Sequence, residues 1–197
     1  MTYPKVLLVL DLQNDLCHKD GVFKKHGLAA YAQLEPLLPN IIDAINFAKQ
    51  NSIPVIASQL TILVDLKKEP IGINHLKFLR PFLESEGLRE GSWGHDILEG
   101  LSKPDYKVQK WGLSPFYHTT LSWYLKAFLA KELILCGFST NGVVESTGRE
   151  AISRGFKITT LTDCVTSYSE SLHQASLSNL GSFGKLLTSK DWQKALQ

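Results

Sequence analysis

The sequence predicts an α/β fold, in which a mostly parallel, doubly wound sheet lies between layers of helices in a three-layer, Rossmann-like arrangement. Short apolar runs without strict alternation are typical of strands buried on both faces, and they alternate with segments of helical period. The connections are short, and the sequence has no internal repeat, linker or low-complexity tract. Because 197 residues suit one α/β unit, we expect a single domain over residues 1–197.

The N-terminal half opens with an apolar strand predicted at Lys5–Leu10. A helix is predicted at Leu34–Asn51, where apolar residues recur with helical period, namely Leu37, Leu38, Ile41, Ile42, Ile45 and Ala48. A second strand is predicted at Ile53–Ala57. From Leu60 to Gly100, prolines and glycines interrupt the regular patterns, so we expect a long excursion with a short helix around His75–Glu84.

The C-terminal half repeats strand and helix at closer spacing. Apolar runs predict strands at Tyr106–Gln109, Lys131–Cys136 and Lys157–Leu161. The helical segments are Thr119–Ala130, Asn141–Arg154 and Ser169–Phe183. Either threonine at the start of the first of these helices can serve as its N-cap.

Composition and charge narrow the classes of partner. A net charge of +2, spread evenly along the chain, offers no basic patch for nucleic acid. There is no apolar run of about 18 residues, as a membrane span requires, and no basic-then-apolar signal peptide. Cys17, Cys136 and Cys164 show no metal or redox spacing. We therefore expect a reduced, cytoplasmic protein whose partner is a small molecule and which needs no cofactor.

Polar residues follow several of the predicted strands. In an open parallel sheet, ligands bind beyond the carboxyl ends of the strands, which places Asp11, Gln59, Lys110 and Ser139–Val143 at one edge. A carboxylate directly after an apolar strand is partly desolvated, which raises its pKa and suits Asp11 to proton transfer. The alternatives are an aspartate that caps a turn and an ordinary solvated lysine.

Two segments together resemble the isochorismatase-like hydrolases, the superfamily of the cysteine amidases. Asp11-Leu12-Gln13-Asn14-Asp15 matches the superfamily motif Asp-x-Gln-Asn-Asp. The segment Thr140–Thr147 matches Thr-Asn-x-Cys-Val-Glu-Ser-Thr except at Val143. The resemblance covers nearly the whole chain and implies that Asp11 is the catalytic acid/base. It also implies that Val143 occupies the position of the nucleophilic cysteine, and valine cannot attack a carbonyl. We expect Asn14 and Asp15 to organise the loop that follows.

The segment Lys110–Phe116 resembles the superfamily pattern Lys-x-x-x-Ser-x-Phe. The resemblance implies that Lys110 pairs with Asp11 and stabilises developing negative charge. A buried ammonium beside a carboxylate is physically reasonable, because each favours the charged form of the other. Lys107 is a rival for this role, but the spacing to the later serine and phenylalanine favours Lys110.

The strand-to-helix turn that follows Cys136 has a mechanical interpretation that does not depend on a family. Gly137 frees the backbone where the strand ends, Asn141 can cap the helix, and the amides of the first turn can stabilise an oxyanion. The alternative is a plain connection of the kind that every α/β protein contains. The resemblance adds a cis peptide bond, which we place between Phe138 and Ser139.

Aromatic residues in glycine-punctuated loops, together with residues of this turn, are the expected substrate pocket. They are Phe23, Trp93, Trp111, Phe116, Phe138, Ser139 and Gly142. The alternative for the tryptophans and phenylalanines is the hydrophobic core. Gln59 joins the set, because Ala57-Ser58-Gln59 resembles the Thr-Ala-Gln-Pro segment of true isochorismatases, whose glutamine helps to hold the substrate.

Val143 is compatible with the chemistry of true isochorismatases. They hydrolyse a vinyl ether, carry a small residue at the turn, and need only acid catalysis, for which Asp11 would suffice. Two observations weigh against that branch of the superfamily. Arg80 is a poor match to the arginine that follows their glutamine, and Glu90–Ile97 looks more like the amidase branch.

We expect no other residue to replace the missing cysteine. Cys17 has His18 beside it, but adjacent residues rarely form a working dyad. Cys136 lies in an apolar strand and is expected to face the core, and Cys164 is expected to be structural. We also expect no metal, because the histidine pair of metal-dependent amidases has no counterpart soon after Gln59.

Three hypotheses for the reaction stay open at this point. The first is a hydrolase that cleaves a vinyl ether or a C–N amide bond by acid/base chemistry at Asp11 and Lys110. The second is a cysteine amidohydrolase whose nucleophile is lost or mutated at Val143. The third is a non-catalytic homologue that binds a small molecule. Because the superfamily is usually oligomeric, the resemblance also implies a homodimer or homotetramer.

Overall fold

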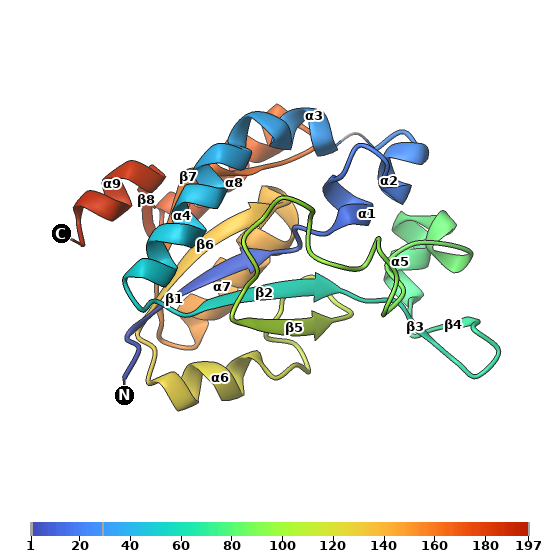
Figure 1. Cartoon of the computed structure of the whole chain (residues 1–197), viewed down its shortest axis with the longest axis horizontal. Coiled ribbons are helices and arrows are strands. Elements are labelled where there is room, and N and C mark those ends of the chain that lie inside the picture. The colour runs from blue at the N-terminus through green and yellow to red at the C-terminus, as the bar shows by residue number, and fades with distance from the viewer. Residues whose placement is uncertain (1, 29, 197) are drawn as a thin grey trace.

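One six-stranded sheet, with all neighbouring strands parallel, forms the centre of the computed structural model, which describes residues 2–28 and 30–196 (Figure 1). Its order is β5-β2-β1-β6-β7-β8. The strands are β1 (Lys5–Leu10), β2 (Val55–Leu60), β5 (Tyr106–Lys110), β6 (Glu132–Phe138), β7 (Lys157–Thr166) and β8 (Lys185–Leu187). The predicted α/β class and parallel sheet are therefore confirmed, and β8 is a strand that we did not predict.

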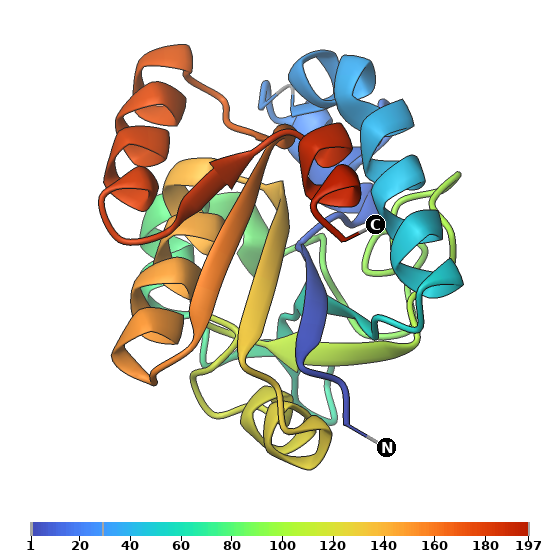
Figure 2. The same cartoon turned by 90° about the vertical axis from the view of Figure 1, so that its left-hand side faces the viewer.

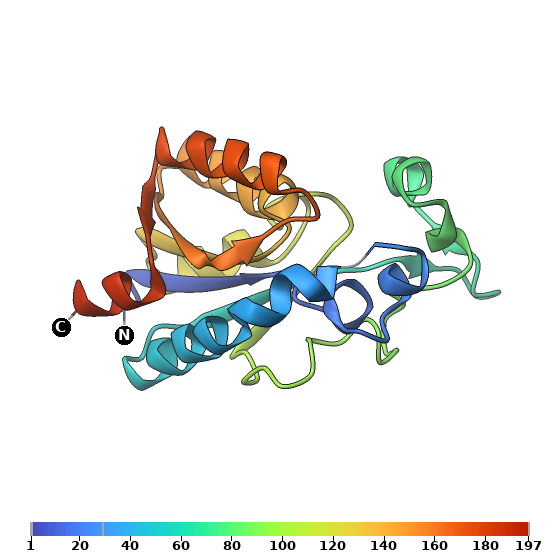
Figure 3. The same cartoon turned by 90° about the horizontal axis from the view of Figure 1, so that it is seen from above.

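Helices cover both faces of this sheet (Figures 2 and 3). One face carries α3 (Ala30–Leu34), the 3-10 helix η1 (Glu35–Leu37), α4 (Leu38–Gln50) and α9 (Ser189–Lys194). The other carries α6 (Leu121–Phe128), α7 (Glu145–Ser153) and α8 (Glu170–Gly181). Alternate side chains of β1 enter two separate cores, with Leu7 and Val9 on the α4 side and Leu8 and Leu10 on the α7 side.

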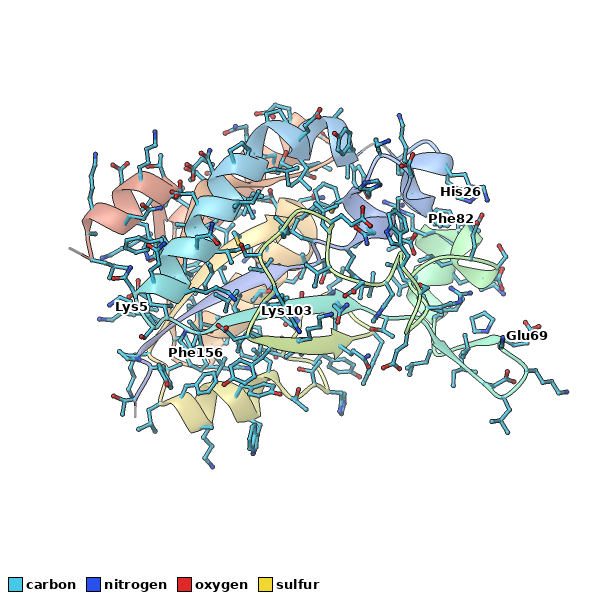
Figure 4. All side chains as sticks on the ribbon, in the orientation of Figure 1. Lys5, His26, Glu69, Phe82, Lys103 and Phe156 are labelled. Atoms are coloured by element: carbon cyan, nitrogen blue, oxygen red, sulfur yellow. The ribbon has the colours of Figure 1, made fainter. Side chains whose placement is uncertain are left out.

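A group of short elements lies beyond the carboxyl ends of β1, β2 and β5 (Figure 1). It consists of α1 (Asn14–Cys17), α2 (Val22–Lys25), β3 (Leu63–Val64), β4 (Pro70–Ile71), α5 (Asn74–Leu79) and the 3-10 helix η2 (Pro81–Glu84). We call the segment from β3 to η2 the arm. The arm contacts the end of α2, where His26, the residue after the helix, stacks on Phe82 with ring centroids 4.1 Å apart (Figure 4).

Prolines explain two differences between predicted and observed helices. The helix predicted at Leu34–Asn51 is divided into η1 and α4, because Pro36 and Pro39 lack amide hydrogens and each sits in a first helical turn. The helix predicted around His75–Glu84 is divided at Arg80, whose φ of −144° and ψ of 74° lie outside the helical region. A residue before proline avoids the α region, and Pro81 follows.

The motif after β1 organises the surrounding loops, as expected. Asn14 Nδ2 donates to the carbonyl of Trp93 at 2.8 Å, and its Oδ1 accepts from the amide of Glu99 at 2.8 Å. The Asp15 carboxylate accepts from the amides of Val22 at 3.3 Å and Leu88 at 2.6 Å. These bonds tie α1, α2 and the loop after η2 to the end of β1. Over the described ranges, no helix combines the length and hydrophobicity needed to cross a bilayer.

Candidate active site

A buried ion pair stands at the carboxyl end of the sheet. Asp11 Oδ2 lies 2.7 Å from Lys110 Nζ, and the two side chains are 7% and 2% exposed. Ser58 Oγ donates to Asp11 Oδ1 at 2.6 Å, and Lys110 Nζ also donates to the carbonyl of Gly112 at 2.8 Å. The expected contact between Asp11 and Lys110 is therefore present, while their catalytic roles stay predictions.

Three adjacent strands bring this pair together. In the registers of β1 with β2 and β2 with β5, Leu10 pairs with Ser58 and Leu60 pairs with Lys110. Asp11 leaves the sheet with a φ of 53°, and its amide lies 3.1 Å from Ser58 Oγ and 3.3 Å from the Ser58 carbonyl. Because both the backbone and the carboxylate of Asp11 are bonded to Ser58, the orientation of the carboxylate is set by β2.

The environment of Asp11 favours proton transfer. Burial raises the pKa of its carboxyl group above the ordinary value, while the Lys110 charge and hydrogen bonds from Lys110 and Ser58 lower it. The net direction is upward, so Asp11 releases its proton at a higher pH than an exposed aspartate does. A carboxyl group of this kind is suited to donating a proton to a substrate as well as accepting one.

The strand-to-helix turn forms a second wall of the site. β6 ends at Phe138, a π-helical turn follows at Thr140–Val144, and α7 begins at Glu145. Gly137 has a φ of 136°, and a Cβ atom there would lie 2.1 Å from the Leu10 carbonyl oxygen, so β1 leaves room only for glycine. The peptide bond between Phe138 and Ser139 is cis, as expected.

One expectation about the turn needs correction. Asn141 is not its cap: Ser139 occupies the N-cap position, and Asn141 Oδ1 accepts instead from Ser167 Oγ. The amides of Gly142 and Val144 donate to the Ser139 carbonyl at 3.1 and 3.2 Å. These two amides are satisfied within the π-helical turn, and the stabilisation of an oxyanion by the other amides of the turn stays a prediction.

The ion pair and the turn face one cavity of about 140 Å³. Most of its wall is apolar, with Leu16, Phe23, Leu60, Leu76, Leu79, Leu83, Leu113, Phe138 and Val143. The other lining residues are Asp11, Arg80, Lys110, Gly112, Ser139, Gly142 and Tyr168. A cavity of this order accommodates about one benzene ring. The site therefore suits a small, largely apolar molecule that presents a reactive group to Asp11.

Seven predicted site residues meet at this cavity. They are Asp11, Lys110, Val143, Phe23, Phe138, Ser139 and Gly142. Val143 is 3% exposed and packs in the α7-side core. Its side chain contributes only apolar surface to the site, so the position at which the resemblance expects a nucleophile carries none.

Gln59 does not reach the cavity. Successive side chains of a strand point to opposite faces, and on β2 it is Ser58 whose side chain meets Asp11. Gln59 is buried on the other face, where its Nε2 donates to the carbonyl of His95 at 2.8 Å.

Three of the expected aromatic residues also lie outside the cavity. Trp93 is 44% exposed, and its Nε1 donates to Glu99 Oε1 at 2.6 Å. Phe116 is buried in the α7-side core beneath the guanidinium of Arg154, as the alternative interpretation proposed for such residues. Trp111 follows Lys110 directly but is not among the residues that line the cavity.

Several residues of the site were not predicted from the sequence. Ser58 orients Asp11, and His173 of α8 shares a buried hydrogen bond of 2.8 Å with Thr140 Oγ1, which supports the π-helical turn. Arg80 and Tyr168 line the cavity from the arm and from the loop after β7. For Ser58, the alternation of the strand was an available signal. For the other three, no local pattern in the sequence indicates the long-range contact.

The cysteines do not supply a nucleophile to this cavity. Cys17, Cys136 and Cys164 are buried and none lines it. Burial raises the pKa of the Cys136 thiol to about 12 and raises that of Cys17 as well. Such thiols are poorly ionised and inert. Among the described residues, no group of three or more His, Cys, Asp or Glu side chains is arranged to hold a metal ion.

Comparison with known proteins identifies similar chains. The model of the isochorismatase domain family matches residues 5–191. Nicotinamidase 3 of Arabidopsis thaliana is 29% identical over 88% of this chain and 79% of its own length. A probable inactive nicotinamidase of the same plant is 26% identical over 96% of this chain and 95% of its own. The crystal structure of a cysteine hydrolase from Pseudomonas syringae pv. phaseolicola superposes with a TM-score of 0.84 at 20% identity, covering 98% of this chain and 92% of that one.

Proposed function

The chain belongs to the isochorismatase domain family of hydrolases, and from this premise we propose that it hydrolyses a small molecule by acid/base chemistry at Asp11 and Lys110, without a cysteine nucleophile. The observation that carries the proposal is the buried Asp11–Lys110 pair at the wall of the cavity. Burying an ion pair costs several kcal/mol of desolvation for each charge. The chain carries this costly ion pair beside a turn that has no nucleophile. The presence of the pair therefore supports a direct role for Asp11 and Lys110 in the reaction.

The raised pKa of Asp11 supports a substrate that is activated by a proton, such as a vinyl ether. Protonation of the terminal alkene carbon by the Asp11 carboxyl group gives an oxocarbenium ion, and water then adds to its carbon. The proton lost by that water returns to Asp11, and the hemiketal collapses to an alcohol and a ketone. Lys110 Nζ, 2.7 Å from Asp11 Oδ2, stabilises the Asp11 carboxylate while the proton of Asp11 is on the substrate.

A C–N amide bond is the other substrate class in this proposal. Here the Asp11 carboxylate takes a proton from water as the water attacks the carbonyl, and passes it to the departing nitrogen. The plant relatives support this class, since the first is a nicotinamidase. Gln59, which pointed toward the vinyl-ether branch, lies outside the cavity and no longer supports that class.

Binding without catalysis is a second candidate function, and a specific observation favours it. Val143 presents only methyl groups where the resemblance to the cysteine amidases expects a thiol. A full-length relative is itself a probable inactive nicotinamidase. A homologue of this kind would keep the cavity and lose the reaction, so the two candidates differ in turnover and not in ligand binding.

Replacing Asp11 by asparagine tests the catalytic candidate. We expect Asp11→Asn to lower turnover by about 100-fold or more, because asparagine cannot exchange the proton. The measurements are pyruvate release from isochorismate and ammonia release from nicotinamide, with equal thermal melting of both proteins as the check on folding. The control is Asp96→Asn, the same change at an exposed carboxylate that pairs with Lys107, and it should retain activity. Equal turnover by both variants would contradict the catalytic role of Asp11, and no turnover by the unaltered protein on either substrate would favour the binding candidate.

A further inference from the structure

A second cavity, of about 350 Å³, lies on the face of the sheet opposite the Asp11–Lys110 pair. Its volume is within the range of small-molecule sites, and apart from one glycine all its lining residues have polar or charged side chains. In the register of β2 with β5, Gln59 pairs with Gln109, so both side chains project to the α4 side of the sheet. The loop between η2 and β5 runs over the two strands on that side (Figure 3). The two cavities share no lining residue.

Gln59 has an unused hydrogen-bond acceptor at this cavity. The residue is 3% exposed, and its Nε2 donates to the carbonyl of His95 at 2.8 Å. Because that contact requires a donor, it identifies the other atom of the amide group as the oxygen Oε1. Among the described residues, no donor bonds to Oε1. A buried polar atom is unfavourable without a partner, so Oε1 indicates a ligand that brings a donor into the cavity.

His95, which is 4% exposed, provides a second acceptor in the cavity wall. Thr61 Oγ1 donates to the carbonyl of Gln59 at 3.2 Å, so its oxygen is the acceptor in the 2.8 Å contact with His95 Nε2. Nε2 therefore carries the proton of the neutral ring, and Nδ1 carries a lone pair. Burial lowers the pKa of His95, which keeps the ring neutral near pH 7. Over the described ranges, no residue bonds to Nδ1.

Glu90 gives the cavity wall its unneutralised charge. Among the charged lining residues, Asp96 and Lys107 neutralise each other, with Lys107 Nζ 2.5 Å from Asp96 Oδ1. The Glu90 carboxylate forms no ion pair with a residue that the structure describes, and its Oε1 accepts from Gln109 Nε2 at 2.6 Å. The wall therefore carries a net charge of about −1, and Glu90 Oε2 is free to accept a further hydrogen bond.

We infer that this cavity binds a small organic cation with several N–H donors, namely a guanidinium compound, through Glu90, Gln59 and His95. All three residues offer acceptors, and a guanidinium has five N–H donors and no acceptor. Its planar fork also matches a carboxylate. A metal ion fits less well, because no group of three or more His, Cys, Asp or Glu side chains among the described residues is arranged to hold one. This site is separate from the proposed hydrolase site and does not depend on hydrolysis.

Methylguanidinium and N-methylurea form a matched pair of probes, because they have nearly the same shape and differ in charge and in one acceptor oxygen. We expect the unaltered protein to bind methylguanidinium at least fivefold more tightly than N-methylurea in an NMR titration. The largest shift changes should occur at the side-chain amide of Gln59 and the ring of His95.

Glu90→Gln tests the charge without removing the acceptor for Gln109. We expect the variant to weaken methylguanidinium binding by about fivefold or more and to change N-methylurea binding less than twofold, because a hydrogen bond to a charged group is stronger than one to a neutral group. Glu99→Gln is the matched control. It changes the net charge equally in the same loop, but Glu99 lies outside the cavity wall and accepts from Trp93 Nε1, so both affinities should stay unchanged.

His95→Phe tests the buried acceptor. The phenyl ring keeps the shape of the side chain and removes Nδ1, while the Thr61 hydroxyl can still donate to the carbonyl of Gln59. We expect methylguanidinium binding to weaken by about threefold or more, with little change for N-methylurea. A merely structural role of His95 would lower both affinities together. If His95→Phe does not fold, Glu90→Gln still decides the test, because Glu90 is exposed.

Three results would overturn the inference. The first is an unaltered protein that binds neither probe or that prefers N-methylurea. The second is an equal effect of Glu90→Gln and Glu99→Gln on methylguanidinium binding. The third is a set of shift changes centred on Phe138 and Val143, which would place the cation in the cavity of Asp11 instead. Binding that follows the expected pattern supports the second site whether or not the protein hydrolyses a substrate.

Discussion

Replacing Lys110 by methionine is expected to destabilise the fold by about 3–5 kcal/mol at neutral pH, because it leaves the Asp11 carboxylate buried without its counter-charge. Lys110 is 1% exposed and is the largest fully buried side chain among the residues that the structure describes. The methionine fills a similar volume, so the loss reports the charge and not a cavity. Urea denaturation monitored by circular dichroism measures the free energy of unfolding, with equal m-values as the check that both proteins unfold in the same way.

The loss should depend on pH in a defined direction. Burial raises the pKa of Asp11, and the charge and hydrogen bond of Lys110 lower it. Without Lys110, the pKa of Asp11 in the folded variant therefore rises further above its value in the unfolded chain. Below the unfolded pKa, Asp11 is protonated in both states, and the variant should approach the stability of the unaltered protein. As pH rises through the folded pKa, unfolding releases a proton and stability falls. The difference between the two proteins should therefore be smallest in acid and grow toward neutral pH.

Two further variants show whether the loss of stability in Lys110→Met comes from breaking the ion pair between Asp11 and Lys110. The double variant Lys110→Met with Asp11→Asn removes both charges and should recover most of the loss. Lys107→Met is the matched control, because Lys107 lies on the same strand and pairs with the exposed Asp96. It should change stability by no more than about 0.5 kcal/mol. A Lys110→Met variant that loses no more than Lys107→Met, or whose loss is the same at every pH, would contradict the structural account of a buried pair.

The sheet and the catalytic edge were predictable because their signals are local. Continuous apolar runs mark β1 and β6, and the rule that ligands bind at carboxyl ends brought Asp11 and Lys110 to one edge before any contact was known. The position of Gly137 was predictable for the same reason, since a strand that stops at a glycine needs an unusual backbone. The direction of the pKa shift of Asp11 followed from its place directly after an apolar strand.

The remainder of the site depends on contacts that no local pattern encodes. Gln59 was misplaced because the predicted strand ended at Ala57, so the alternation that puts Ser58 and Gln59 on opposite faces was not applied. Arg80 and Tyr168 meet across a long separation in the sequence, through an arm whose fold is divided by proline. The bonds of the Gly142 and Val144 amides to the Ser139 carbonyl arise because the helix begins with a π-helical turn.

Replacing Val143 by cysteine is expected to create a reactive thiol and raise amide hydrolysis by about 10³-fold or more, since loss of a nucleophile alone can cost an enzyme up to about 10⁶-fold. The change replaces the two methyl groups of valine by one thiol, at a cavity that already holds a proton acceptor, Asp11, and a cation, Lys110. The acceptor takes the thiol proton and the cation stabilises the thiolate. Ammonia release from nicotinamide and the rate of iodoacetamide labelling measure the two effects.

The native cysteines make the labelling specific. All three are buried, and burial raises their pKa values, so rapid labelling reports on the introduced thiol alone. Val144→Cys is the matched control, because the neighbouring Val144 is fully buried in the core and does not line the cavity. If only Val143→Cys shows fast labelling and amide hydrolysis, Asp11 and Lys110 are placed so that they can activate a nucleophile at the turn. If Val143→Cys labels no faster than Val144→Cys and hydrolyses no amide, the pair cannot activate a group at the turn, and the binding candidate gains support.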